Sequence, residues 1–246
     1  MLLFIFDFMN KIICLWSCPR NISTALMYSF AQRKDTQVFD EPLYAHYLKK
    51  SGVYHPAKEE VLKSLENDGN KVVQKVILQK SKKILFHKLM THFLIDIDTD
   101  FLSKVSNIIF IRNPEEIITS YSKVIPNPKM SDIGVKQQYE LYLSLKEIGE
   151  NPIVLDSKYL LKNPELMLRK LCNILGISFD EKMLKWEKGA RKEDGVWANY
   201  WYENIHNSTG FLPYTKKEII LTGSNAELAE ECLPYYEFLT TKSIQL

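Results

Sequence analysis

The stretch CLWSCPRNISTALMYSF, residues 14–30, leads from a buried strand into a helix without a glycine. The apolar run Ile12–Trp16 predicts the strand, and the pattern Ser23–Arg33 predicts the helix. One interpretation of the connection is an anion site, where backbone amides, hydroxyls and a guanidinium meet at the helix N-terminus. The other is an ordinary turn that is capped by Asn21 or Ser23. The connection consists of Pro19, Arg20, Asn21, Ile22, Ser23 and Thr24.

The composition of the 246-residue chain is that of an ordinary globular protein, with 46% hydrophobic and 25% charged residues. A net charge of +2 is far from the strongly basic balance of nucleic-acid-binding proteins, so we expect no nucleic-acid partner. The cysteines show neither a C-x-x-C pair nor metal-ligand spacing, which predicts a cytoplasmic protein without a metal site. These cysteines are Cys14, Cys18, Cys172 and Cys232.

The first eight residues, MLLFIFDF, are apolar except for Asp7 and are too short to span a bilayer. Neither a basic region nor a small-residue cleavage site marks them as a signal peptide. We interpret residues 1–10 as an extra edge strand or as an N-terminal extension before a natural start at Met9. Because no repeat, linker or low-complexity tract interrupts the chain, we expect residues 1–246 to form a single domain without a membrane span.

Short apolar segments alternate with longer helical patterns along the chain. This alternation is typical of parallel βαβ units, and it predicts a three-layer α/β fold with a mostly parallel central sheet flanked by helices. The segment Lys71–Lys82 fits a helix and a strand equally well. The other expected strands are Thr36–Phe39, Lys83–His87, Asn107–Ile111 and Pro152–Leu155, and the other expected helices are Pro56–Asn67, Pro114–Lys123, Val135–Gly149, Pro164–Leu175 and Ser224–Glu231.

Charged side chains follow four of the predicted strands at the point where each strand ends. They are Arg20, Glu41, Lys88 and Arg112. Because the carboxyl ends of parallel strands meet at one edge of a sheet, we expect these side chains to lie together around a ligand. Asp40, which precedes Glu41, is expected to have a structural role.

The spacing between Arg112 and Ser120 is the most specific of these sequence patterns. Pro114 predicts the first turn of a helix, so Arg112 precedes the helix and Ser120 lies about two turns inside it. A guanidinium at that end can grip an anion. Alternatively, Arg112 pairs with Glu115 or Glu116.

These motifs resemble those of the P-loop-related sulfotransferases that use 3′-phosphoadenosine 5′-phosphosulfate (PAPS). SCPRNISTAL resembles the family's 5′-phosphosulfate loop, and IIFIRNPEEIITSY resembles its 3′-phosphate motif. VFDEPLY and ILFHKLMTH resemble acceptor-side segments with a glutamate base and a lysine. ARKEDGVW, residues 190–197, resembles the loop that closes over the 3′-phosphate. The similarity is greatest to a little-characterised bacterial branch and extends from Ile12 to Leu212.

The resemblance implies a sulfotransferase that moves a sulfuryl group from PAPS to a small-molecule acceptor. PAPS is then the co-substrate, no metal is required, and the acceptor offers a hydroxyl or an amine. The residues that the resemblance assigns to catalysis are Glu41, Lys88 and Arg20, and those that it assigns to PAPS are Pro19, Arg20, Asn21, Ile22, Ser23, Thr24, Arg112, Ser120, Arg191 and Lys192.

The first loop departs from the family pattern at Arg20 and Asn21, where many members carry a lysine and a glycine. An arginine can clamp a phosphosulfate through two donors, but it cannot give a proton to a leaving oxygen at neutral pH. We expect Lys88 to supply the missing ammonium and Glu41 to act as the base. The alternative bases are His46, His87 and His92.

Two questions stay open at the level of sequence. The aromatic tract WANYWYENIHNSTGF, residues 197–211, can form a lid, an acceptor wall or simply core beneath a long loop. A non-catalytic protein that binds adenosine 3′,5′-bisphosphate or PAPS is an alternative to the enzyme. A nucleotide kinase of related topology is a weaker alternative, because the chain contains no G-x-x-x-x-G-K-[ST] motif.

Overall fold

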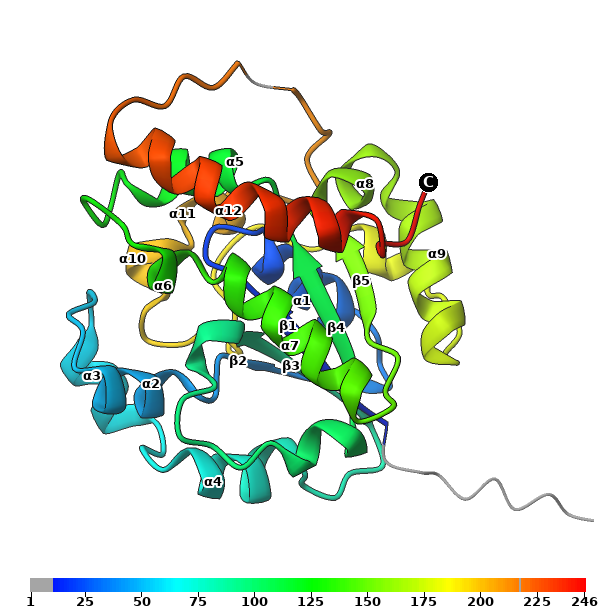
Figure 1. Cartoon of the computed structure of the whole chain (residues 1–246). Helices are drawn as coiled ribbons and strands as arrows, with labels where there is room; N and C mark the ends of the chain where they lie inside the picture. The colour runs from blue at the N-terminus through cyan, green and yellow to red at the C-terminus, as the bar shows by residue number, and fades with distance from the viewer. Residues whose placement is uncertain (1–10, 217) are drawn as a thin grey trace, which may run out of the picture.

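A computed structural model describes residues 11–216 and 218–246 of the chain, so the edge strand or extension expected at residues 1–10 lies outside the described residues. Its strands form one fully parallel sheet in the order β2-β3-β1-β4-β5 (Figure 1). All five expected strands are confirmed, with ends within three residues of the predicted positions. Their bounds are β1 Ile12–Ser17, β2 Thr36–Asp40, β3 Ile84–Met90, β4 Ser106–Ile111 and β5 Ile153–Asp156.

Helices of varied length connect the strands and close the chain. The larger ones are α1 (Ser23–Ala31), α2 (Tyr44–Ser51), α3 (Lys58–Ser64), α5 (Pro114–Tyr121), α7 (Val135–Glu147), α8 (Ser157–Lys162), α9 (Pro164–Leu175) and α12 (Ser224–Thr240). Short helical segments are α4 (Gly69–Val72), η1 (Val73–Ile77), η2 (Thr91–Phe93), η3 (Asp100–Lys104), α6 (Met130–Ile133), η4 (Glu181–Leu184), α10 (Ala198–Trp201) and α11 (Glu203–His206).

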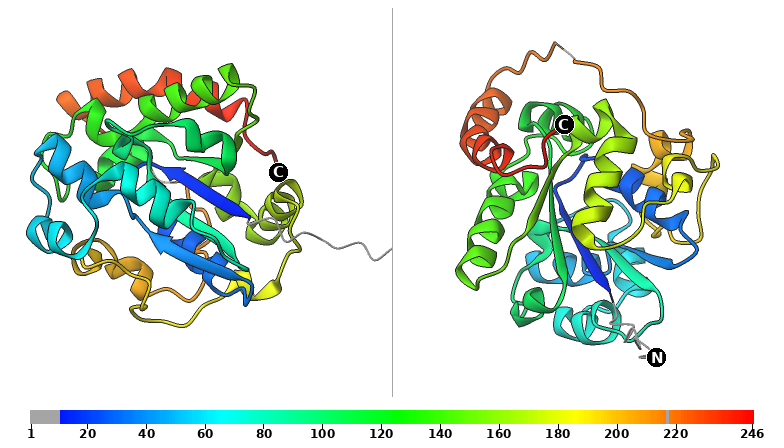
Figure 2. Two further views of the ribbon diagram at one scale, coloured as in Figure 1. Left: turned by 90° about the horizontal axis from the view of Figure 1, so that it is seen from below. Right: turned by 90° about the vertical axis from the view of Figure 1, so that its right-hand side faces the viewer.

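The helices cover both faces of the sheet, as the two views of Figure 2 show, and the predicted three-layer α/β fold is therefore confirmed. Side chains along β1 alternate between the two faces, as strand geometry requires. Cys14 and Trp16 pack with α2, α3, α7 and α12, whereas Ile13 and Leu15 pack with α1, α8 and α9. The sheet is thus buried on both sides, which explains why its strands are apolar throughout.

The structure corrects one helical prediction, assigns the segment that the sequence left ambiguous and adds a helix that was not predicted. The predicted helix Ser224–Glu231 continues to Thr240 despite Pro234, because its buried residues pack against the sheet and α5 and offset the backbone hydrogen bond lost at the proline. The ambiguous segment Lys71–Lys82 is helical from its start to Ile77. Helix Tyr44–Ser51 was not predicted, since its eight residues are too few for a clear period.

The sheet order places a topological switch point between β1 and β4. The connection that leaves β1 runs toward β2, whereas the connection that leaves β4 runs toward β5 on the other side. Ligands of open α/β sheets bind in the crevice outside such a point, at the carboxyl ends of the strands. The loop with Arg20 follows β1, and the loop with Arg112 follows β4, so both loops border this crevice.

A buried amide joins the two strands that border the crevice. The Gln138 side chain of α7 donates to the Trp16 carbonyl of β1 at 3.1 Å and to the Phe110 carbonyl of β4 at 2.7 Å. The side chain of Gln138 is fully buried. These bonds link β1 to β4 near the carboxyl ends of the two strands.

Replacing Gln138 by methionine, which has nearly the same shape, should therefore lower the free energy of unfolding. We expect a loss of about 1–3 kcal/mol, because two buried carbonyls lose a donor. Urea denaturation of Gln138→Met, with the half-exposed Lys136→Met of the same helix as a control, measures this loss. The control should differ from the parent by less than about 0.5 kcal/mol. Equal unfolding free energies for the two variants would contradict the role of Gln138.

Candidate active site

The loop after β1 has a strained backbone and leaves the start of α1 without a side-chain cap. Arg20 and Ile22 both have positive φ angles, of 60° and 50°. A positive φ angle is rare for any residue with a side chain, and it is rarer still for a β-branched residue such as Ile22. Asn21 donates its side-chain amide to the Phe110 carbonyl instead of capping the helix. The capping alternative is therefore wrong, and the amides of the first turn remain available to an anion.

The guanidiniums of Arg20 and Arg112 meet at this loop. Arg20 Nε donates to Ser120 Oγ at 3.0 Å, and Arg112 donates to the Arg20 carbonyl. Arg112 Nε also pairs with Glu116 Oε2 at 2.8 Å, so the alternative ion pair is present together with the loop contact. Burial lowers the pKa of Arg20, and the neighbouring charge of Arg112 lowers it further. The structure thus brings three predicted residues together: Arg20, Arg112 and Ser120.

A buried ion cluster forms where β2 and β3 end. Asp40 and Lys88 are partners in the register of these two strands, so their side chains lie on the same face of the sheet. Lys88 Nζ lies 2.8 Å from Asp40 Oδ1 and 2.6 Å from Glu41 Oε1. All three side chains are buried. The predicted partners Glu41 and Lys88 therefore lie in direct contact, and Asp40 joins them.

The charges of this cluster depend on one another. Burial disfavours the ammonium of Lys88, but the two carboxylates more than offset this and raise its pKa well above its usual value. Burial raises the pKa of Glu41, the Lys88 charge opposes that rise, and the Asp40 charge adds to it. Glu41 Oε1 accepts the bond from Lys88, whereas none of the side-chain bonds of the described residues reaches Glu41 Oε2. Glu41 therefore offers a carboxylate oxygen that can accept a proton.

Two consecutive residues of the aromatic tract contact the cations of the site: Trp201 contacts Arg20, and Tyr202 contacts Lys88. The carbonyl of Trp201 accepts from Arg20 Nη1 at 3.4 Å, and the Trp201 ring lies 6.0 Å from the guanidinium. The hydroxyl of Tyr202 contacts Lys88 Nζ at 2.5 Å and Asp40 Oδ2 at 2.7 Å. The tract therefore covers the strand ends. Sequence reasoning singled out this tract but not Tyr202, because a single tyrosine among many aromatics carries no signal of its own.

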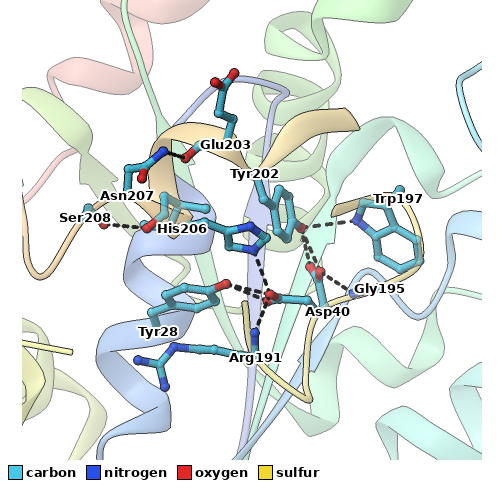
Figure 3. A network of polar contacts seen from close by, with 12 residues as sticks. Tyr28, Asp40, Arg191, Gly195, Trp197, Tyr202, Glu203, His206, Asn207 and Ser208 are labelled. Atoms are coloured by element: carbon cyan, nitrogen blue, oxygen red, sulfur yellow. Dashed lines mark hydrogen bonds and ion pairs between the residues drawn. The ribbon is translucent and has the colours of Figure 1, made fainter. Parts of the chain in front are cut away.

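Another carboxylate, Asp194, fixes the segment that leads into the tract. Its partners Tyr28, Arg191 and His206 are labelled in Figure 3. It accepts hydrogen bonds from the Tyr28 hydroxyl at 2.7 Å and from the Arg191 backbone amide at 2.8 Å. Its Oδ2 also lies 2.9 Å from His206 Nε2. Asp40 helps in the same way by accepting from the Gly195 amide at 3.3 Å. Bonds to these two carboxylates hold the segment onto α1 and β2.

Arg191 and Lys192, which were assigned to the 3′-phosphate, lie apart from Arg112 and Ser120. The guanidinium of Arg191 lies 4.7 Å from the ring of Tyr28, about one and a half turns along α1 from its first residue. Lys192 is 90% exposed at its side chain and pairs loosely with Glu193 at 3.7 Å. Their role toward PAPS remains a prediction.

The three histidines that were considered as alternative bases are all buried. His46 accepts from the Gly69 amide at 3.0 Å and contacts the Ile95 carbonyl at 2.7 Å. His87 is stacked on Phe39 at 4.6 Å, on the face of β3 opposite to Lys88. Burial lowers the pKa of both His87 and His92 to about 3, so neither is protonated near neutrality.

A cleft with a volume of about 560 Å³ runs along the outer strand β2. Asp40, Gly195 and Trp197 line its inner end. In the described part of the chain, no cluster of three or more histidine, cysteine or acidic residues is arranged to hold a metal ion. The same residues include no helix that is long and apolar enough to cross a membrane.

Comparisons with known proteins identify the family of this chain and support its fold. Residues 10–243 match the family described as the sulfotransferase domain. A sulfotransferase from Alicyclobacillus acidocaldarius superposes with a TM-score of 0.57 at 11% identity, over 96% of this chain and 97% of the other. The sulfotransferase domain from the curacin biosynthetic pathway gives 0.51 at 15% identity, over 90% and 97% of the two chains. At these identities the two structures support the fold.

Curated relatives are more similar in sequence but carry a different name. The branched-chain-amino-acid aminotransferase-like proteins 2 and 1 of Arabidopsis thaliana are 41% and 42% identical over 233 and 231 residues. The match covers 93% of this chain but only 41% of each plant protein. The chain therefore spans less than half the length of these relatives.

The ion cluster provides a stability test of the site. Lys88→Met leaves two buried carboxylates without their cation, so we expect a loss of about 3–5 kcal/mol in the free energy of unfolding. Lowering the pH protonates these carboxylates and should shrink the loss, since the unpaired charge disappears. Urea denaturation at neutral and acidic pH measures both effects.

Lys50→Met serves as the matched control, because Lys50 pairs with Asp96 at 3.2 Å on the exposed surface. Such a pair contributes less than about 1 kcal/mol. A Lys88 variant that is no less stable than this control, or whose loss grows as the pH falls, would contradict the assigned charges.

Proposed function

The chain belongs to the sulfotransferase domain family, and we propose that it transfers a sulfuryl group from PAPS to a small-molecule acceptor. The acceptor group is a hydroxyl or an amine. The observation that carries the proposal is that Trp201 and Tyr202 bridge the two halves of the site. Trp201 contacts the guanidinium of Arg20, and Tyr202 contacts the Glu41–Lys88 pair, so two consecutive residues link the cations of both loops.

The groups around the β1 loop fit an anionic donor. The uncapped first turn of α1 offers backbone amides, and the residues Pro19 to Thr24 surround them. Arg20 adds a guanidinium, with Ser23 and Thr24 hydroxyls nearby in the chain. On this proposal these groups hold the phosphosulfate. Arg112 and Ser120, on the other side of the switch point, hold the 3′-phosphate, and Arg191 and Lys192 reach it only after their segment moves.

The acceptor side supplies the groups that the transfer itself requires. The acceptor oxygen or nitrogen attacks the sulfur, the bond from sulfur to the phosphate oxygen breaks, and adenosine 3′,5′-bisphosphate leaves with the electron pair. Glu41 takes the acceptor proton at Oε2. The ammonium of Lys88 and the guanidinium of Arg20 stabilise the charge that develops in the transition state.

The name of the plant relatives raises the question of aminotransfer, which uses a lysine that forms a Schiff base. Such a lysine must lose its proton to act as a nucleophile. Lys88, the one lysine classed as buried among residues 11–216 and 218–246, is instead held as an ammonium by Asp40 and Glu41. No observation in the described structure favours aminotransfer.

The donor assignment predicts a preference for a nucleotide with phosphates at both positions. We expect adenosine 3′,5′-bisphosphate to bind far more tightly than AMP or ATP, since only it reaches Arg112 and Ser120 as well as the β1 loop. Arg112→Ala should weaken bisphosphate binding by about 2–3 kcal/mol, the value of a lost charge-assisted contact. Isothermal titration of each nucleotide, with and without EDTA, measures these differences, and EDTA should have no effect.

Arg169→Ala is the matched control, because Arg169 pairs with Glu165 four residues away, just as Arg112 pairs with Glu116. This variant should bind like the parent. Equal affinity for AMP and the bisphosphate would remove the 3′-phosphate assignment. Normal binding by a poorly folded Arg112→Ala would make Arg112 a purely structural ion-pair partner.

If Glu41 is the base, Glu41→Gln should slow sulfuryl transfer and leave the binding of the bisphosphate unchanged. The glutamine keeps the shape of the side chain but accepts no proton, so transfer should fall about 10²–10⁴-fold while bisphosphate binding persists. In the parent, transfer should decline on the acid side at a pH above the usual glutamate pKa, because burial raises the pKa of Glu41. A sulfate-transfer assay over alcohols, phenols and amines measures the rate at each pH.

Glu59→Gln on the exposed surface of α3 is the control and should transfer sulfate at the parent rate. Undiminished transfer by Glu41→Gln would show that another residue acts as the base. A parent protein that binds the bisphosphate tightly but transfers sulfate to nothing would instead be a non-catalytic binding protein.

A further inference from the structure

The outer edge of β2 carries backbone groups that no strand of the described sheet pairs with. Asp35 and Glu41, just before and just after β2, form backbone bonds with β3. Because bonding alternates along a strand, the odd-numbered residues face β3, and the even-numbered residues Thr36, Val38 and Asp40 face outward. Among the described residues, the amides of Val38 and Asp40 donate to no other group. The edge therefore offers hydrogen-bonding groups to a further strand.

This edge is recessed in the cleft of about 560 Å³ that runs along β2. Val38, in the middle of the strand, is only 7% exposed, although β2 is the outermost strand on its side of the described sheet. Ala31 of α1 borders the cleft on one face of the sheet, and Val72 of α4 and Val76 of η1 border it on the other. The edge can therefore be reached by a chain as thin as a single extended peptide.

A second copy of this protein does not fit this edge. Its own β2 is recessed in the same way, and paired strands must approach to about 4.8 Å. The helices that border the two clefts would meet before the strands came that close. An extended peptide carries no flanking helices and meets no such obstacle.

The walls of the cleft are apolar on both faces of the sheet. Ala31 and Val38 belong to one wall, and Leu65, Val72 and Val76 form the other. Successive side chains of an extended peptide point to opposite sides, so both rows of its side chains would lie against aliphatic groups. β-Branched residues suit such an environment. The wall segment η1 is a π-helix, a rare conformation that is frequent at functional sites.

A positive charge lies at the end of the cleft where β2 begins. Lys83 lines the cleft there and precedes Ile84, which pairs with Thr36 in the register of β2 and β3. Its side chain is exposed, and no ion pair within the described part of the chain involves it. Antiparallel pairs are the more stable per residue, so the C-terminal end of an added peptide would lie at Lys83. An acidic residue at that end complements the charge.

We infer that this cleft docks an extended peptide segment of a partner protein, which adds to β2 as an antiparallel strand. The middle of the segment consists of uncharged β-branched residues, and its C-terminal end is acidic. About five residues are enough to run along β2, which itself has five. The inference does not depend on sulfuryl transfer, and its test requires no donor.

A synthetic peptide tests the docking on the unmodified protein. The probe is acetyl-Thr-Val-Val-Val-Thr-Asp-amide, and its control has the same side chains but a methyl group on every backbone nitrogen. The control should bind at least about tenfold more weakly, because it can donate no backbone hydrogen bond to β2. Isothermal titration measures both affinities. Absence of binding, or equal affinities of the two peptides, would overturn the inference.

Two pairs of variants locate the peptide on the protein. Val76→Glu places a carboxylate in the apolar wall and should weaken binding at least about tenfold, because the peptide would bury that charge. Gln74→Glu adds the same charge on the exposed side of η1 and should bind like the parent. Equal affinities of these two variants would overturn the inference.

If Val76→Glu does not fold, the exposed Lys83 replaces it as the site of substitution. Lys83→Glu sets a carboxylate against the acidic end of the probe and should weaken binding about threefold or more. Lys82→Glu, at an exposed neighbour that does not line the cleft, should weaken it less. Equal affinities of the two lysine variants would overturn the inference.

Hydrogen exchange distinguishes a peptide from a second copy at this edge. The probe should slow the exchange of the Val38 and Asp40 amides, which face the cleft. Without the probe, their exchange should not depend on protein concentration. Unchanged exchange with the probe present would overturn the inference. Protection that rises with protein concentration alone would assign the edge to a second copy and would also overturn it.

Discussion

The buried ammonium of Lys88 and its two carboxylates are the interaction on which the acceptor side of this protein depends. A charge in the interior is tolerated only when it is paired and hydrogen-bonded, so the cluster holds its members in one geometry. Neighbouring strands set that geometry, since Asp40 and Lys88 are register partners in β2 and β3. Tyr202 then completes the ammonium's bonds and brings the aromatic tract down onto the strand ends.

The donor side is built on the opposite principle, because its charges are left partly uncompensated. Arg20 and Arg112 carry like charges that meet at one loop, and only Arg112 has an acidic partner, Glu116. The loop adopts two unfavourable backbone conformations and leaves the first amides of α1 uncapped. Such strain and unsatisfied polarity are typical of sites that await a ligand, here an anion.

The segments that were predicted correctly are those with a strong local sequence pattern. The strands were recognised because burial on both faces makes them apolar throughout, and Pro164–Leu175 was placed correctly because a proline and a glycine bound it. The end of α12 was misplaced because packing outweighs the effect of Pro234. Arg191 and Lys192 were joined to Arg112 on motif similarity, whereas Asp194 holds their loop against Tyr28 on α1.

The amino-acid sequence by itself determined the α/β layering, the order of strands and helices along the chain, and the charged residues at or near the ends of four strands. Apolar periodicity and turn residues act over a few positions, so they can be read without a structure. Only the tertiary structure decided which of these residues meet. The pairing of Lys88 with both Asp40 and Glu41, the contact of Arg20 with Ser120, and the position of Tyr202 on Lys88 join residues 47, 48, 100 and 114 positions apart. Such contacts depend on sheet order and on the folding back of the aromatic tract, which no local pattern encodes.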